Sequence, residues 1–179
     1  MPTILTHPAV PLALRLGLGR KTIPKRLLIV GIFASILPDL DVVAFRLGIP
    51  YAAEWGHRGF SHSLAFALLI AVIGACLARP LQTTVKRAFW FLFFAVASHG
   101  VLDAFTNGGL GIAFFWPIST ERFFLPWHPI QVAPLSVTRF LSQRGIDVLQ
   151  SELIWVWAPC FGLAFIVLIV RRLRILVRR

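Results

Sequence analysis

Long runs of apolar residues divide the chain, and short basic or polar segments separate them. Four runs approach or reach the roughly 20 residues that a helix needs to cross a bilayer. They are 27–45, 60–78, 89–105 and 153–170. A weaker run over 4–19 contains Pro8, Pro11 and Arg15, so it either spans, re-enters or lies in the interface. The pattern predicts an all-α fold, a polytopic transmembrane helical bundle of four to five spans.

The composition supports a membrane environment. The chain has 179 residues, is 58% hydrophobic and has a mean hydropathy of +0.80, which is more apolar than soluble domains of this size. A single integral membrane domain over 1–179 is expected, with an outer interfacial connection over 107–151. Cys76 and Cys160 lie inside apolar runs and are predicted to be buried free thiols. The first residues show no cleavable signal peptide.

The basic residues are segregated along the predicted topology. Of the 18 Lys and Arg residues, thirteen lie before the span at 27–45, between the second and third spans, or after the last span. They are Arg15, Arg20, Lys21, Lys25, Arg26, Arg79, Lys86, Arg87, Arg171, Arg172, Arg174, Arg178 and Arg179. Because cytoplasmic segments are enriched in Lys and Arg, these segments and the C-terminus are predicted to be cytoplasmic in an inner (plasma) membrane.

The net charge of +11 raises nucleic-acid binding as an alternative. The basic residues lie at span ends, as the membrane bias requires, and no nucleic-acid-binding motif accompanies them. DNA and RNA are therefore not the expected partners. The tail 171–179 is instead predicted to bind anionic lipid head groups.

Ionisable side chains interrupt the predicted spans. Asp39 and Asp41 lie in the first, and His99 and Asp103 lie in the third. A carboxylate near mid-bilayer costs about 2.5–3.5 kcal/mol on insertion scales, so such residues indicate a functional site. The i, i+4 spacing places His99 and Asp103 on one helix face. A bend at Pro38 is expected to turn both carboxylates of the first span toward one cavity.

Three of the remaining histidines are predicted to lie at the same depth in the bilayer as these residues. His57 and His62 precede or begin the second span, with Ser61 as its expected N-cap, and His7 joins them if 4–19 crosses the bilayer. The pattern predicts one metal site facing the periplasm or cell exterior. Its candidate ligands are His7, Asp39, Asp41, His57, His62, His99 and Asp103. Imidazole and carboxylate are the ligands that zinc and related divalent ions use.

Each candidate also has a purely structural interpretation. Polar side chains hold helix bundles together through hydrogen bonds, and a His–Asp pair can serve this purpose alone. The gathering of so many candidates at one depth favours the metal site. His128, between Trp127 and Pro129, indicates interfacial anchoring and is not an expected ligand. Glu54 is a candidate acid–base residue, with a solvated loop position as the alternative.

Several short motifs together resemble a known family. They are Thr6-His7, Leu37-Pro38-Asp39-Leu40-Asp41, His57-Arg58-Gly59-Phe60-Ser61-His62-Ser63, Ser98-His99 with Asp103, Asn107-Gly108-Gly109 and Trp116-Pro117. Over roughly residues 3–130 this combination resembles the LexA-binding, inner membrane-associated hydrolases, also called membrane-bound metal-dependent hydrolases. The ligand order is more distantly similar to zinc-dependent phospholipase C, although this chain has too few histidines for a three-zinc site of that kind.

The resemblance implies a hydrolase, and the phospholipase likeness implies phosphoester bonds. One to three divalent ions, zinc being the expected one, would activate a water, and Arg58 would bind a phosphate. The expected substrate is a membrane lipid or lipid-linked phosphoester at the outer boundary. Three alternatives stay open: metal-dependent amide or ester hydrolysis, a non-catalytic scaffold or regulatory protein, and a metal transporter or sensor. Against the last, no ionisable residues continue inward from the site.

Overall fold

The computed structural model describes residues 1–134 and 136–177. Its elements are α1 (Ala9–Leu18), α2 (Lys25–Ile36), η1 (Leu37–Val42), α3 (Val43–Arg46), η2 (Phe60–His62), α4 (Leu64–Cys76), α5 (Val85–Ala104), α6 (Val137–Phe140), α7 (Gln143–Glu152), η3 (Leu153–Trp157) and α8 (Ala158–Val177). η1 and η2 are 3-10 helices, and η3 is a π-helix. Within these described ranges, β pairing is limited to two isolated bridges. The predicted all-α fold is confirmed.

Within the described residues, three continuous helical segments are long and apolar enough to cross a membrane. They are Lys25–Arg46, Val85–Ala104 and Gln143–Val177, of 22, 20 and 35 residues. α1 and α4 are apolar but have only 10 and 13 residues. At 1.5 Å per residue, α1 is about 15 Å long, roughly half the hydrocarbon thickness of a bilayer. The structure thus supports three candidate spans, and the count of four to five stays a prediction.

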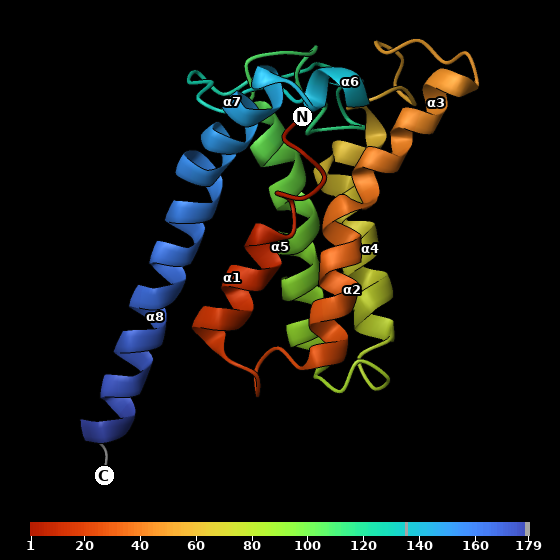
Figure 1. Cartoon of the computed structure of the whole chain (residues 1–179). Helices are drawn as coiled ribbons and strands as arrows, with labels where there is room; N and C mark the ends of the chain where they lie inside the picture. Colours follow the sequence, from red (N-terminus) through yellow and green to blue (C-terminus); the bar gives the residue numbers. More distant parts are fainter. Residues whose placement is uncertain (135, 178–179) are drawn as a thin grey trace.

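The helices form an upright bundle with one long outer helix. Figure 1 shows α1, α2, α4 and α5 together, with α8 slanting along their outer side. The turns from α1 to α2 and from α4 to α5 lie at the lower end. The connection that follows α5, with α6 and α7, covers the upper end, where the N-terminus also lies. Hydrogen bonds from Thr3 and Thr6 to Glu152 place the N-terminal segment beside the end of α7.

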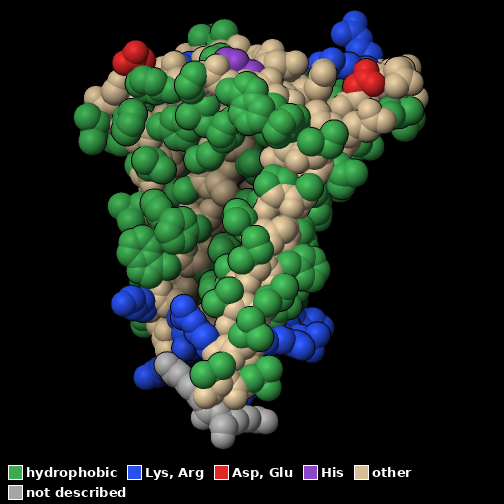
Figure 2. Space-filling model, turned by 90° about the vertical axis from the view of Figure 1, so that its left-hand side faces the viewer, with side chains coloured by type: hydrophobic (Ala, Val, Ile, Leu, Met, Phe, Trp, Pro, Cys, Tyr) green, Lys and Arg blue, Asp and Glu red, His purple; other side chains and the backbone are tan. Residues whose placement is uncertain are grey.

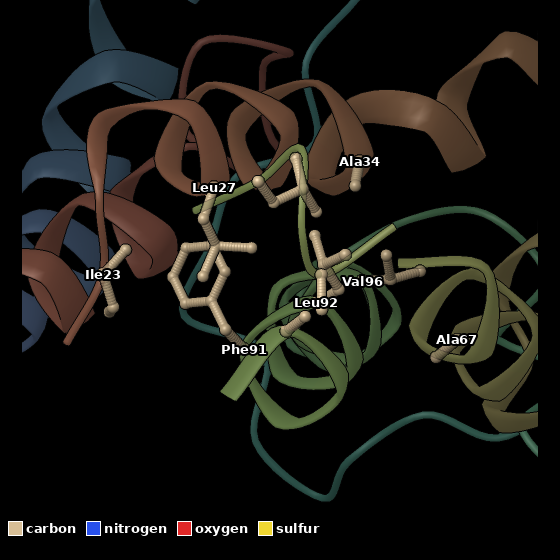
Figure 3. Close-up of a cluster of buried hydrophobic side chains, with 10 residues drawn as sticks. Ile23, Leu27, Ala34, Ala67, Phe91, Leu92 and Val96 are labelled. Carbon is tan, nitrogen blue, oxygen red and sulfur yellow. The ribbon is translucent and has the colours of Figure 1, made fainter. Parts of the chain in front are cut away.

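An apolar cluster joins α2, α4 and α5 (Figure 3). Leu27 of α2 and Leu92 of α5 are almost fully buried within it. A Cβ atom at Gly31 would collide with the ring of Phe91, and one at Gly74 would collide with Leu92. Small residues at such positions let helix backbones approach closely, which is how membrane helices gain packing energy. These contacts hold α5, which carries His99 and Asp103, against α2 and α4, whose upper ends adjoin η1 and η2.

The surface agrees with a membrane environment. Figure 2 shows hydrophobic side chains over the flanks of the bundle, while most of the visible Lys and Arg side chains lie at its lower end. The structure therefore gathers basic residues that are far apart in the sequence. Arg178 and Arg179, assigned to the same group, lie outside the described residues. Which side of a membrane this end faces remains a prediction from the charge bias.

The long connection ends earlier than the sequence suggested. Gln143–Glu152 forms α7 and continues through η3 into α8, rather than belonging to a connection over 107–151. α7 is amphipathic, because Val148 is buried while Gln143 and Arg144 are exposed. A search for apolar runs therefore starts this helix ten residues late.

The two cysteines are free, as expected, but not fully buried. Cys76 is exposed near the end of α4, and Cys160 is partly buried in α8. An apolar run predicts burial in protein or in lipid without distinguishing them, so the expectation of buried thiols was wrong for Cys76.

Candidate metal centre

The aspartates of the first span lie where α2 tightens into η1. Pro38 stands at the start of η1 and, lacking an N–H, cannot continue the α-helical ladder. A 3-10 helix turns about 120° per residue instead of about 100°, so residues two apart diverge by about 120° rather than about 160°. Asp39 and Asp41 therefore both reach the interior, with side chains 3% and 4% exposed.

α5 supplies His99 and Asp103, one turn apart and fully buried. The Nδ1 atom of His99 lies 2.7 Å from the backbone carbonyl oxygen of Ser35 in α2. Because a carbonyl oxygen only accepts, Nδ1 carries the proton. The lone pair of Nε2 then points toward the other polar side chains, which is the tautomer that a metal-ligating histidine needs.

His62 comes from η2, the short 3-10 turn before α4. Ser63, not Ser61, caps α4 by accepting a backbone N–H of its first turn at 3.1 Å. The prediction of a Ser61 cap was wrong because the α-helix begins at Leu64, after the extra turn. The Ser61 hydroxyl instead donates to Asp41 Oδ2 at 2.7 Å. The turn thereby holds His62 against the first span.

Four buried side chains from three elements converge. Asp39, His62, His99 and Asp103 each offer a ligand atom within 4.8 Å of those of the other three. His99 Nε2 is 3.1 Å from His62 Nε2 and 3.3 Å from Asp39 Oδ1. His62 Nε2 is 3.4 Å from Asp103 Oδ2. Two imidazole nitrogens and two carboxylate oxygens form a donor set that suits zinc and related divalent ions.

His7 lies against this group from a separate segment just before α1. It is 1% exposed, and its ring stacks on that of His99 with centroids 3.6 Å apart. Its Nε2 is 3.6 Å from Asp39 Oδ2 and 3.9 Å from Asp103 Oδ1. These are not the oxygens nearest to His99 and His62. The structure therefore brings His7 to the centre although α1 is too short to span by itself.

Many polar atoms of the centre have no hydrogen-bond partner within the described part of the chain. They are both ring nitrogens of His7, Nε of Arg58 and all four carboxylate oxygens of Asp39 and Asp103. A buried polar group left without a partner costs about 1–3 kcal/mol, and more when it is charged. The donor types and their lack of other partners both fit a divalent cation.

The buried charges point the same way. The centre contains three carboxylates, those of Asp39, Asp41 and Asp103, and one guanidinium, that of Arg58, which pairs with Asp103. These four side chains carry two net negative charges when the histidines are neutral. One divalent cation would neutralise them. Protonation of two histidines would balance the charge equally well, and Nε2–H groups on His62 and His99 would face Asp103 Oδ2 at 3.4 Å and Asp39 Oδ1 at 3.3 Å. These two N–H groups would, however, also face each other, because the two Nε2 atoms are 3.1 Å apart. A divalent cation balances the charge without that conflict.

Asp41 and His57 form an outer layer of the centre. Asp41 Oδ1 is 2.5 Å from His57 Nδ1, while Oδ2 accepts the backbone N–H of Arg58 at 3.0 Å and lies 3.2 Å from His62 Nδ1. A carboxylate on Nδ1–H leaves Nε2 of His62 free for a metal, the usual carboxylate–histidine–metal relay. Asp41, His57 and His62 also form a possible ligand group. Since both oxygens of Asp41 already have partners, the geometry favours a supporting role, and direct ligation stays a prediction.

The guanidinium of Arg58 is engaged by the protein itself. Arg58 is 1% exposed, and its Nε lies 3.2 Å from Asp103 Oδ2. Its terminal nitrogens donate to the Gly108 carbonyl at 2.7 Å and to the Thr106 hydroxyl at 3.0 Å. Burial raises the pKa of the nearby Tyr51 phenol, which is therefore neutral. A phosphate would have to displace these contacts, so the predicted phosphate-binding role has no free guanidinium to support it.

Glu54 and His128 lie apart from the centre. Glu54 is exposed and accepts the indole N–H of Trp116 at 3.2 Å. His128 is exposed and meets the ring of Phe124 edge-on, with centroids 5.3 Å apart. The position of His128 agrees with its interpretation as an anchor. The acid–base role of Glu54 stays a prediction, because its carboxylate meets Trp116 rather than a member of the ligand group in the described part of the chain.

Two supporting residues were missed in the sequence. Ser35 contributes only a backbone carbonyl, for which no side-chain signal exists. Glu152 is 1% exposed and binds Thr3 and Thr6, directly before His7. Its signal was a lone carboxylate bordering the last apolar run, but nothing in the sequence connects it with a segment 146 residues away.

Comparison with known proteins identifies the family. A family model described as YdjM inner membrane protein matches residues 1–175, so the chain belongs to this family. It is similar to the inner membrane protein YbcI of Escherichia coli (strain K12), with 46% identity over 160 residues, 89% of this chain and 92% of that protein. No solved structure matches. Both names describe inner membrane proteins, in agreement with the apolar helices, and neither mentions LexA, a metal or hydrolysis.

Proposed function

We propose that this member of the YdjM inner membrane protein family is a membrane-embedded, metal-dependent hydrolase of a phosphoester in a lipid or lipid-linked substrate. The single observation that carries the proposal is the buried group of Asp39, His62, His99 and Asp103. Its carboxylate oxygens make no hydrogen bond within the described residues, although Arg58 Nε lies 3.2 Å from Asp103 Oδ2. Two imidazole nitrogens face each other at 3.1 Å. Polar groups in an apolar environment are costly, so a donor set of this kind is expected to serve a function.

The four residues would hold the ion, and His7 would complete its surroundings. The chemistry that a divalent ion supplies in such a site is a lowered pKa of water and polarisation of a phosphoryl oxygen. Asp41 Oδ2 accepts the hydrogen on Nδ1 of His62, which leaves Nε2 of His62 available for the ion. Arg58 balances the charge of Asp103 instead of contacting substrate in this geometry.

His57 is the best-placed proton acceptor. Its Nδ1 faces Asp41 at 2.5 Å, so its Nε2 is left as the basic nitrogen. Its side chain is 5% exposed, while the side chains of His62 and His99 are not exposed at all. A positioned histidine contributes about 10²–10⁴-fold to hydrolysis by general acid–base catalysis. His57 therefore replaces Glu54 as the expected acid–base residue in this proposal.

An amphiphilic substrate suits the location. The centre lies toward the upper end of the bundle, opposite the basic residues (Figures 1 and 2). The connection over this end exposes large apolar side chains, among them Phe115, Ile118 and Trp127. A lipid head group near the centre would leave its chains beside such residues. We expect this end to face the periplasm, because the basic end is the predicted cytoplasmic one.

The deciding experiment is the metal content of detergent-purified protein. Wild type is compared with His99→Ala and Asp103→Asn, and His128→Ala serves as the control at a histidine outside the centre. About one equivalent of zinc or a related ion is expected in wild type and in the control, as a four-ligand site requires. Both centre variants should lose it at matched yield and helicity.

Metal-loaded protein is then assayed on phospholipids and lipid phosphates, with carboxylic esters and amides alongside. Phosphoester turnover that a phosphate analogue inhibits and that His57→Ala lowers would support the proposal. Turnover of the ester or amide alone would replace it with the rival hydrolase. Folded wild type that takes up no metal even after reconstitution would contradict the metal centre itself.

A non-catalytic role is the second candidate, and one observation favours it. The four central residues are at most 4% exposed, so a substrate needs an opening in this end of the bundle. A metal that only ties the helices together would raise thermal stability without turnover on any ester. A scaffold of this kind would tolerate His57→Ala without loss of function, whereas the hydrolase would not.

A further inference from the structure

A buried carboxylate at the junction of α7 and η3 binds the N-terminal segment. Glu152, at the end of α7, is 1% exposed. Its Oε2 accepts the hydroxyl hydrogens of Thr3 at 2.7 Å and Thr6 at 2.6 Å. Its Oε1 accepts the backbone N–H of Thr3. A single side chain therefore satisfies three donors of a segment that leads directly into His7.

The hydroxyl of Thr6 is the link to the metal centre. While it donates to Glu152, it also accepts the indole N–H of Trp157 at 3.0 Å. The next residue is His7, whose two ring nitrogens have no hydrogen-bond partner among the described residues. Apart from its stacking on His99, the placement of His7 thus depends on the segment that carries it.

The π-helix explains how two residues of one helix reach the same hydroxyl. Glu152 and Trp157 are five residues apart. Glu152 directly precedes η3 (Leu153–Trp157), and Trp157 is its last residue. In an α-helix, residues five apart diverge by about 140° around the axis. A π-helix closes its hydrogen bonds from i to i+5, so such residues lie one above the other, and π-bulges often occur at functional sites. The irregular turn places both side chains against Thr6.

We propose that Glu152 is a positioning residue of the metal centre, which holds the segment 3–6 so that His7 lies against the bound ion. The inference rests on the proposed metal centre and goes beyond it, because it assigns a role to a residue of a different helix. A buried carboxylate is more costly than an apolar residue of similar size. Hydrogen bonds with fixed directions, however, define the register of the segment in a way that apolar packing does not.

The test is the affinity for zinc, measured in competition with a chromophoric chelator. Glu152→Gln removes the charge and one acceptor while it keeps the shape, and Thr6→Val removes only the hydroxyl. Both should weaken zinc binding by about 10- to 100-fold, as the loss of outer partners of metal ligands typically does. Thr6→Ser keeps the hydroxyl and should bind as wild type does. Asp147→Asn, a carboxylate five residues earlier on α7 that contacts Gln143, is the matched control.

A double-mutant cycle separates positioning from general stability. If Glu152 acts through His7, Glu152→Gln should weaken zinc binding no further in a His7→Ala background. Equal losses in both backgrounds, or unchanged affinity in Glu152→Gln, would overturn the role. Should Glu152→Gln fail to fold, the Thr6→Val and Thr6→Ser pair carries the same comparison. Wild type without bound zinc would remove the metal centre as well, whereas equal affinity in wild type and Thr6→Val would remove only the role of Glu152.

Discussion

The same helices build two very different interiors. Where α2, α4 and α5 meet, Phe91 packs over Gly31 and Leu92 over Gly74, and no polar atom is involved. At the end of the same helices, His62, His99 and their neighbouring carboxylates meet at 3.1–3.4 Å, and many of their polar atoms form no hydrogen bond with any described residue. The first interior is complete as it stands. The second has polar atoms that the proposed cation would pair.

The difference shows how the two functions of the bundle are divided. Close packing of small and large residues holds membrane helices together without any bound partner. The polar end adds little to this, because buried charges cost more than they return unless they are fully paired. The apolar cluster therefore supports the helices, and the polar end is available for chemistry. Each prediction below alters one region and measures stability, zinc affinity or both.

Removing the metal should have the largest effect. A ligand that binds only the folded state stabilises it by about 4 kcal/mol at a thousandfold excess over its dissociation constant. Chelation of wild type is therefore expected to lower the unfolding temperature in detergent by several degrees, and added zinc should restore it. The lost stability should come from the metal centre, where His99 and Asp103 lie, and not from the apolar cluster.

His99→Ala is the matched control, because its stability should no longer respond to the chelator. Equal unfolding temperatures of wild type with and without chelator would show that the polar centre, like the apolar cluster, needs no bound cation for its stability. That result would return the histidines and aspartates to the role of hydrogen-bonding helix partners.

The apolar interior was the more predictable of the two from sequence. Long apolar runs locate helices because the bilayer requires their backbone groups to be paired internally. The pairing of Gly31 with Phe91 was not predictable, since the runs do not show which faces meet. The ends of the spans were also not predictable. The polar residues of α7 interrupt the apolar pattern, although α7 is continuous with the last span.

The polar centre was predictable where spacing carried the information. His99 and Asp103 are one turn apart, and Pro38 marks the tightened turn that directs Asp39 inward. The sequence did not show which residues bind the ion directly and which support a ligand from outside, because this depends on contacts between individual side-chain atoms. Only the contact of His62 Nδ1 with Asp41 indicates an outer carboxylate behind an inner ligand. The contact between His99 and the Ser35 carbonyl was also not predictable, because any residue type can supply a backbone carbonyl.

Opening a cavity in the apolar interior should have the next largest effect. Leu92→Ala removes the side chain that packs on Gly74 and is expected to cost about 2–3 kcal/mol of unfolding free energy, the low end for such changes. The low end applies because lipid, rather than water, solvates separated helices. Zinc affinity should stay within about threefold of wild type, since the mutated site is separate from the ligands.

Leu92→Met serves as the control, because a volume-conserving change costs less than about 1.5 kcal/mol. A loss of zinc affinity in Leu92→Ala as large as the loss in a ligand variant would show that the two interiors are coupled. The division of roles between them would then be wrong.

The smallest effect should come from the outer layer of the polar centre, and it distinguishes support from ligation. Asp41→Asn keeps the shape of the side chain but replaces a carboxylate oxygen opposite His57 or His62 with an amide N–H. As an outer partner, Asp41 should account for about a 10- to 100-fold change in zinc affinity, or about 1.4–2.7 kcal/mol, with one equivalent still bound. As a direct ligand, it should lower the stoichiometry itself. Ser61→Ala, which removes one of the hydrogen bonds to Asp41, should show a smaller loss of affinity in the first case. Stoichiometric loss in Asp41→Asn would instead show that the second ligand group holds an ion of its own.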